Sequence, residues 1–132
     1  MFEDLEAWQQ ARHLVNEISS LTRKNSSLSK DFGLTDQLQR AAVSIMSNVA
    51  EGFEWTHLPE KIQFYNIARG STGEVRSLLY VISDNYPRPA PIAERLRGTA
   101  ISVGKLVSGL LRSTEGRKGG FPISYLLPSI FR

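Results

Sequence analysis

Apolar residues recur at intervals of three and four along most of the chain, which is the spacing of one face of an α-helix. Four stretches carry this pattern, at about residues 4–22, 34–53, 59–83 and 92–113. The polar segment 23–33 and the proline-rich segment 86–91 separate neighbouring stretches. Short connections of this kind join antiparallel helices. The pattern therefore predicts an all-α fold, an antiparallel four-helix bundle of up-down-up-down topology.

The expected helix over residues 34–53 has a polar sector beside its apolar face. An ordinary surface helix does not align amides, a guanidinium, hydroxyls and a carboxylate in this way. We expect a buried polar network that fixes the register of the helices; its members are Arg40, Ser44, Asn48 and Glu51, together with Glu74 from the next helix. The alternative interpretation of the same residues is a small pocket.

The third side of this helix is also apolar. Val43, Met46 and Ala50 follow one another at steps of four or three. A helix occupied on three sides has a central position or contacts another subunit. These three residues are therefore the predicted oligomer interface.

Small and capping residues set the expected helix ends. Thr35 is the expected N-cap of the second helix, and Gly52 lies close to its end. Gly70 and Gly73 fall inside the third helix, where each costs about 1 kcal/mol relative to alanine. That cost indicates that close packing or a contact requires them.

The chain divides into a bundle over residues 1–113 and a different segment over residues 114–132. The latter begins with a basic, glycine-rich hinge and continues with seven large apolar residues interrupted by prolines. Prolines disfavour a regular helix, and so dense an apolar strip is expected to pack on its own bundle or on a neighbour.

Composition restricts the class of protein. The 132 residues suffice for one domain, and without cysteine neither disulfides nor thiolate metal sites can form. The amino terminus is acidic, unlike a secretory signal, and no apolar run reaches the roughly 20 residues that span a bilayer. We expect a cytoplasmic protein of bacterial type that does not enter the membrane.

Positive charge is concentrated near the carboxyl end. Residues 1–94 contain 9 Lys and Arg against 12 Asp and Glu, whereas residues 95–132 contain 7 against 1. Such asymmetry is typical either of contact with an acidic partner such as nucleic acid or of a solvated helix face with a basic tail. On the third helix, Arg69 and Arg76 share a face with Tyr65 and Tyr80, which can stack on bases or form a subunit interface.

Three sequence blocks make the chain similar to a known family. These are DLEAWQ at residues 4–9, RAAVSI and SNVAEGF within 40–53, and IARGS at 67–71 followed by Glu74. They resemble a bacterial four-helix-bundle family encoded in intervening sequences of ribosomal RNA genes, related to the accessory variability protein of diversity-generating retroelements. The resemblance covers about residues 2–112. Gln39 and Met46 depart from it, since the family usually has Arg and Pro there.

The resemblance implies a homopentameric ring of bundles and, from the retroelement relatives, nucleic-acid binding in support of a reverse transcriptase. We therefore expect a non-catalytic oligomeric accessory protein that binds RNA or DNA through basic surfaces of the ring. The alternative is a structural or protein-interaction module that binds no nucleic acid. The candidate nucleic-acid-binding residues are Arg69, Arg76, Arg97, Lys105, Arg112, Arg117 and Lys118.

Enzymatic activity and cofactors are not expected. The sequence has no phosphate-binding glycine loop, no paired metalloprotease histidines and no nucleophile elbow. Glu54 and His57 match the Glu-x-x-His spacing of di-metal bundles, but such sites need the motif twice, and His13 is expected to face solvent beside Glu17. No catalytic, cofactor-binding or metal-ligating residue is therefore predicted.

Overall fold

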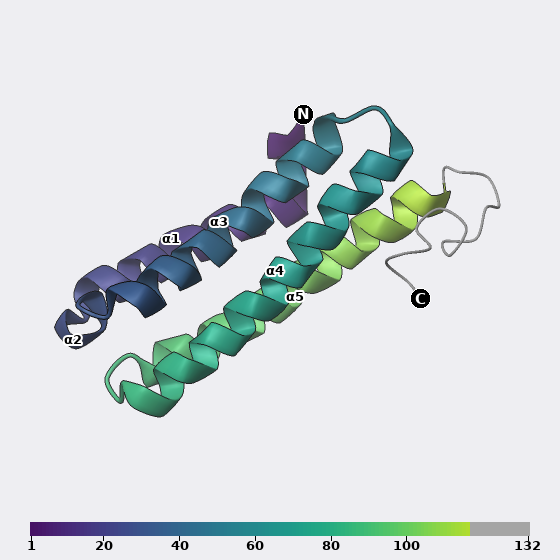
Figure 1. Cartoon of the computed structure of the whole chain (residues 1–132). Helices are drawn as coiled ribbons and strands as arrows, with labels where there is room; N and C mark the ends of the chain where they lie inside the picture. Colours follow the sequence, from purple (N-terminus) through teal and green to yellow (C-terminus); the bar gives the residue numbers. More distant parts are fainter. Residues whose placement is uncertain (117–132) are drawn as a thin grey trace.

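Helices make up almost all of the part of the chain that the structure describes. The computed structural model describes residues 1–116, which form a short 3-10 helix, η1, and five α-helices (Figure 1). In chain order these are η1 (Phe2–Asp4), α1 (Glu6–Lys24), α2 (Ser26–Ser29), α3 (Phe32–Glu54), α4 (Leu58–Asn85) and α5 (Ala90–Gly116). The prediction of an all-α helical bundle is confirmed.

The four long helices run alternately up and down, and the single turn α2 lies in the first connection (Figure 1). α3 packs against α1 and α4, and α5 packs against α4 and α1, so each long helix has two neighbours. Aliphatic side chains at helical spacing fill the centre, and burying them is the main stabilising contribution to the fold. Fully buried examples are Leu14, Ile18, Leu38, Ile45, Val49, Val75, Leu79, Leu96, Val103 and Val107.

The connection between α1 and α3 corrects the predicted N-cap. Asp31, not Thr35, caps α3, because its carboxylate accepts a hydrogen bond from the Leu34 N–H at 3.3 Å. The same carboxylate accepts a 2.6 Å bond from the Tyr86 hydroxyl, which raises the pKa of that phenol and links the two turns at this end of the bundle. Thr35 is a buried residue of the first helical turn.

Gly52 lies close to the end of α3, as predicted, but it does not cap the helix, which continues to Glu54 with Trp55 as its C-cap. The carbonyl groups near this end are satisfied instead by the buried Lys61 of α4. Its ammonium donates hydrogen bonds to the backbone oxygens of Gly52, at 3.0 Å, and Phe53, at 2.8 Å. A cation is favoured at a helix C-terminus, so this contact joins the two helices at their turn.

α5 extends three residues beyond the predicted end of the bundle. Thr114, expected in a hinge, is buried, and its hydroxyl donates a 2.7 Å bond to the Leu110 carbonyl one turn earlier. The remainder of the predicted hinge and the apolar tail lie outside the described residues. Among residues 1–116 no helix is long and apolar enough to cross a membrane.

Candidate functional site

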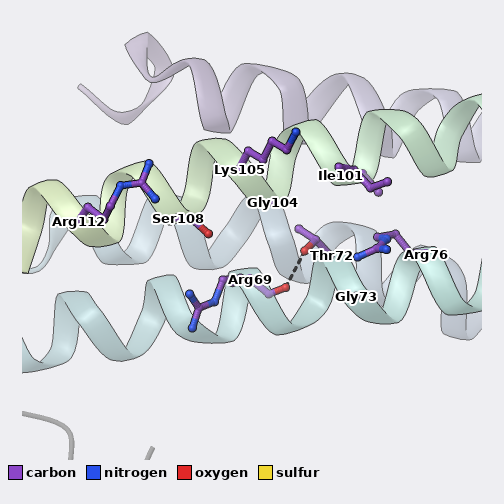
Figure 2. Close-up of a pocket in the computed structure, with 10 residues that line it drawn as sticks. Arg69, Thr72, Gly73, Arg76, Ile101, Gly104, Lys105, Ser108 and Arg112 are labelled. Atoms are coloured by element: carbon purple, nitrogen blue, oxygen red, sulfur yellow. Dashed lines mark hydrogen bonds between the residues drawn. The ribbon is translucent and has the colours of Figure 1, made fainter. Parts of the chain in front are cut away.

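The seam between α4 and α5 contains a groove of about 580 Å³. Because the two helices are antiparallel neighbours, one face of each contributes to its walls. Arg69, Thr72, Gly73 and Arg76 come from α4, and Ala100, Ile101, Gly104, Lys105, Ser108 and Arg112 come from α5. Figure 2 shows the two walls, with basic side chains on both sides of the hollow.

Four exposed cations surround this groove: Arg69 and Arg76 on α4, and Lys105 and Arg112 on α5. Within each helix the two cations are seven residues apart, which is about 10 Å along the axis and places both on one face of the helix. Within residues 1–116 none of the four forms an ion pair with a carboxylate. Arg69 donates a hydrogen bond to the neutral Asn66 side chain, at 3.0 Å. Among the described residues, the groove therefore presents an excess of positive charge to solvent, with no carboxylate in ion-pair contact.

Small residues keep the floor of the groove open. A Cβ atom at Gly104 would lie 3.1 Å from the Thr72 hydroxyl, so this glycine allows the two helices to approach closely. A Cβ at Gly73 would meet nothing within 4 Å. Gly73 is thus not required by packing in the protomer, and its missing side chain leaves the hollow accessible. The same test finds open space at Gly70, so close packing among the described residues requires neither glycine, and the alternative, a contact that requires them, stays a prediction.

Arg97 lies farther along the same seam. Its guanidinium is 4.0 Å from the centroid of the Tyr80 ring and donates a 2.6 Å hydrogen bond to the Ser83 hydroxyl. Both partners belong to α4, and Ile101, one turn after Arg97, lines the groove. Arg97 therefore continues the row of cations while packing α5 against α4.

Glu115, near the end of α5, is an acidic side chain that interacts electrostatically with two cations of this row, Arg69 and Arg112. Partial burial raises the pKa of its carboxyl above the ordinary value, and the positive charges of Arg69 and Arg112 oppose that rise. It lies at the end of the groove where those two arginines come from opposite walls.

The profile of the 23S rRNA-intervening sequence protein family matches residues 3–109. The chain belongs to this family. Its fold is similar to the crystal structure of a protein of unknown function from the S23 ribosomal protein family of Bacteroides thetaiotaomicron VPI-5482, with a TM-score of 0.74 at 18% identity. That match covers 85% of this chain and 99% of the other. No curated protein matches the sequence.

The groove of this intervening-sequence protein unites four of the seven predicted nucleic-acid-binding residues: Arg69, Arg76, Lys105 and Arg112. Arg97 lies beside it, and Arg117 and Lys118 lie outside the described residues. The grouping of Tyr65 with Tyr80 is wrong, because Tyr65 is buried in the core, whereas Tyr80 is 53% exposed.

The predicted polar network is only partly present in this family member. Asn48 donates to the Ser44 hydroxyl at 3.1 Å, and that hydroxyl lies 2.8 Å from the hydroxyl of Ser71 on α4. Arg40 instead bonds Asp36 on its own helix at 2.9 Å, with a side chain that is 79% exposed.

Glu51 and Glu74 are exposed, and neither has a side-chain hydrogen bond or ion pair to another described residue. The prediction of a buried network is thus wrong for these two and for Arg40. Helical periodicity grouped residues of one sector without showing that the sector faces solvent in the protomer.

The three residues of the predicted oligomer interface differ in how exposed they are. Val43 is 48% exposed, but Met46 packs partly against the core, and Ala50 is half-buried. Only Val43 of the three is therefore a prominent surface residue. Ile67, on the next helix, is a second exposed apolar side chain at 44%.

The histidines of the family member do not assemble a metal centre. His57 pairs with Glu60, not with Glu54, and His13 pairs with Glu17 at 2.9 Å. In the described part of the chain no three acidic or histidine side chains are grouped as metal ligands would be.

Proposed function

We propose that this chain is a non-catalytic accessory protein that binds nucleic acid through the α4–α5 groove. The observation that supports the proposal is the set of four groove cations, none of which forms an ion pair with a carboxylate of residues 1–116. By contrast, Arg40 and Arg95 elsewhere on the bundle are neutralised by Asp36 and Glu17. Cations without an ion-paired carboxylate among residues 1–116, two on each wall of an open groove, suit a ligand that brings several negative charges.

The chemistry of the groove favours phosphate over a lone carboxylate. Three of its four cations are arginines, whose planar guanidinium donates two parallel hydrogen bonds to phosphate oxygens. The hydroxyls of Thr72 and Ser108 add neutral polar groups to the walls. Contacts of this kind position a backbone but do not read base edges, so binding without strong sequence preference is expected.

Assembly is the second part of the proposal. One protomer contributes few phosphate contacts and therefore little affinity. A homopentameric ring would repeat the groove five times, and linked sites engage one polyanion with far greater avidity than any single site. The exposed Val43 and Ile67 on the outer faces of α3 and α4 support a subunit contact there. The proposal also includes a cytoplasmic location for the protein and a protein partner such as a reverse transcriptase.

The same exposed residues also support a second candidate function. If the face that carries Val43 and Ile67 contacts a different protein, the chain is an interaction module. The groove cations would then only keep the protein soluble. Nucleic-acid binding distinguishes the two, because only the first function requires it.

The deciding experiment measures binding of a labelled oligonucleotide at several salt concentrations. Wild-type protein is expected to bind at about 50 mM salt, with affinity falling by a log–log slope of about −0.7 for each phosphate contacted on a single strand. The Arg69→Gln/Arg112→Gln variant should bind more weakly and with a shallower slope.

A matched control removes the same charge far from the groove. Arg23→Gln/Arg88→Gln changes two exposed arginines at the opposite end of the bundle and should leave the slope close to wild type. Equal losses in both variants would mean that net charge, not the groove, determines binding. Absence of wild-type binding at low salt would leave the interaction module as the better proposal.

A further inference from the structure

The Arg97–Tyr80 pair has the form of a stacking platform. Tyr80 is 53% exposed, so it is accessible to a ligand. Arg97 lies over its face at 4.0 Å and is held there by the bond to Ser83. Nucleic-acid bases stack on aromatic rings and on guanidinium planes, and this pair brings one of each together where Tyr80 is exposed.

The Arg97–Tyr80 platform lies in line with the groove cations along the α4–α5 seam. On α5, Arg97 precedes Lys105 by eight residues, about 12 Å along the helix axis, and Lys105 precedes Arg112 by about 10 Å. On α4, Tyr80 follows Arg76 by about one turn. The seam therefore has Arg69 and Arg112 at one end, Arg76 and Lys105 in the middle, and the platform at the other end.

A stacking platform beside a row of cations is expected to favour single-stranded over double-stranded nucleic acid. A duplex keeps its bases stacked inside and offers a platform nothing to bind, whereas a single strand can place a base there while its phosphates follow the cations. The Arg69–Arg112 pair and the Arg76–Lys105 pair, each formed across the seam, lie about 10 Å apart along the helices. At a rise of about 3.4 Å per stacked nucleotide, this distance corresponds to about three nucleotides.

We infer that the α4–α5 seam binds single-stranded nucleic acid, with phosphates at the two cation pairs and one base stacked on the Arg97–Tyr80 platform. The inference rests on the proposed nucleic-acid function and specifies its ligand. The competing explanation is that Arg97 and Tyr80 only pack α5 against α4, in which case the groove responds to phosphate charge alone.

The test compares four probes of equal length and matched sequence: single-stranded RNA, single-stranded DNA, duplex, and an abasic single strand that carries phosphates without bases. Wild-type protein should bind one or both base-bearing single strands at least about fivefold more tightly than the duplex and the abasic strand. Loss of one stacked base corresponds to roughly a 5- to 150-fold weaker affinity. The ratio of RNA to DNA affinity then reports whether the 2′-hydroxyl is contacted.

Two variants show whether the platform causes that preference. Tyr80→Ala removes the ring and should reduce single-strand binding towards the level of the abasic probe, while leaving abasic binding unchanged. Tyr80→Phe keeps the ring and should behave as wild type, since no described contact uses the hydroxyl. Circular dichroism checks that both variants remain folded.

The outcomes separate the inference from the function on which it rests. Equal affinity for single strand, duplex and abasic strand would overturn the inference and leave charge-driven binding in place. An unchanged preference in folded Tyr80→Ala would also overturn it. Failure of all four probes to bind at low salt would remove the proposed function itself.

Discussion

The ring of Tyr65 lies so close to the backbone of Gly52 that no side chain fits between α3 and α4 at that point. A Cβ atom at position 52 would be 2.5 Å from Cε1 and 2.7 Å from Cδ1 of the ring. Tyr65 is 1% exposed, so its ring cannot move into solvent to make room. This contact sets how closely the two helices approach beside their turn.

Gly52→Ala is therefore expected to destabilise the fold, although alanine normally favours a helix. Overpacking a filled core costs about 1–3 kcal/mol, which exceeds the helix-propensity gain of about 1 kcal/mol. Chemical denaturation followed by circular dichroism measures the change in the free energy of unfolding. Gly70→Ala is the matched control, because a Cβ there meets nothing within 4 Å and should stabilise the helix. Equal stability changes in the two variants would contradict the packing role.

Lys61 is expected to stabilise the same turn through its two bonds to backbone carbonyls. Lys61→Met keeps an unbranched side chain but removes the charge and the donors. Hydrogen bonds to charged groups contribute about 1.5–3 kcal/mol, so a loss of that order in the free energy of unfolding is predicted. Lys30→Met, at an exposed position, should change stability by less than about 0.5 kcal/mol. A neutral result for Lys61→Met would show that water satisfies these carbonyls equally well.

Glu17 and Arg95 form the ion pair that joins two long helices in the described structure. Arg95 donates at 2.9 and 3.3 Å, and its hydrogen bonds are the main reason that the pKa of Glu17 is below its ordinary 4.5; His13 also contributes. A depressed carboxyl pKa stabilises the fold above the unfolded-state value, and that contribution is lost as pH falls through the lower folded-state value.

Replacing Arg95 with Gln should therefore lower the unfolding temperature at neutral pH and have progressively less effect below about pH 4.5. The measurement is a series of thermal melts from neutral to acidic pH. Arg88→Gln, which removes an exposed arginine that has no ion pair among residues 1–116, is the control for net charge. A wild-type-to-variant difference independent of pH would exclude the carboxylate as its source.

The helices were predictable because apolar periodicity and solvent exclusion act on the same residues. Leu38, Ile45 and Val49 align on one face in the sequence and are all fully buried. Helix ends were less predictable, since they depend on tertiary partners. Asp31 is a suitable cap partly because Tyr86, 55 residues later, orients its carboxylate.

The groove was only half predictable for a related reason. The seven-residue spacing of Arg69 with Arg76 and of Lys105 with Arg112 is visible in the sequence. That the two pairs face one another depends on which helices are neighbours, and the openness of the groove depends on Gly73 and Gly104. Glu115 has no sequence signal that links it to Arg69 on a different helix.

Assembly of the proposed ring predicts a particle mass several times 14.8 kDa in light scattering, most simply five times. Val43→Asp should reduce that mass without unfolding the helices, because the side chain is exposed in the protomer. Met46→Asp is a poorer test, since it would also place a charge against the core.

Ile92→Asp is the matched control for that experiment. Ile92 is also exposed, at 41%, but it lies in the first turn of α5, where an acidic residue is compatible with the helix dipole. It should leave the particle mass unchanged. A monomeric wild-type protein at micromolar concentration would remove the ring from the proposed function.

Glu115 is expected to weaken nucleic-acid binding, because it places a negative charge beside the two arginines at one end of the groove. A phosphate bound there would raise the pKa of this carboxyl further than burial already does, so affinity should increase as pH falls towards the free-state pKa. Glu115→Gln should tighten binding at neutral pH by roughly two- to fivefold, the size of one screened charge interaction, and should abolish that part of the pH dependence.

The comparison is made at constant ionic strength with one oligonucleotide. Glu94→Gln, an exposed carboxylate nearer the start of α5, controls for net charge and should leave the pH dependence unchanged. If Glu115→Gln binds like wild type at every pH, the phosphates do not approach this end of the seam.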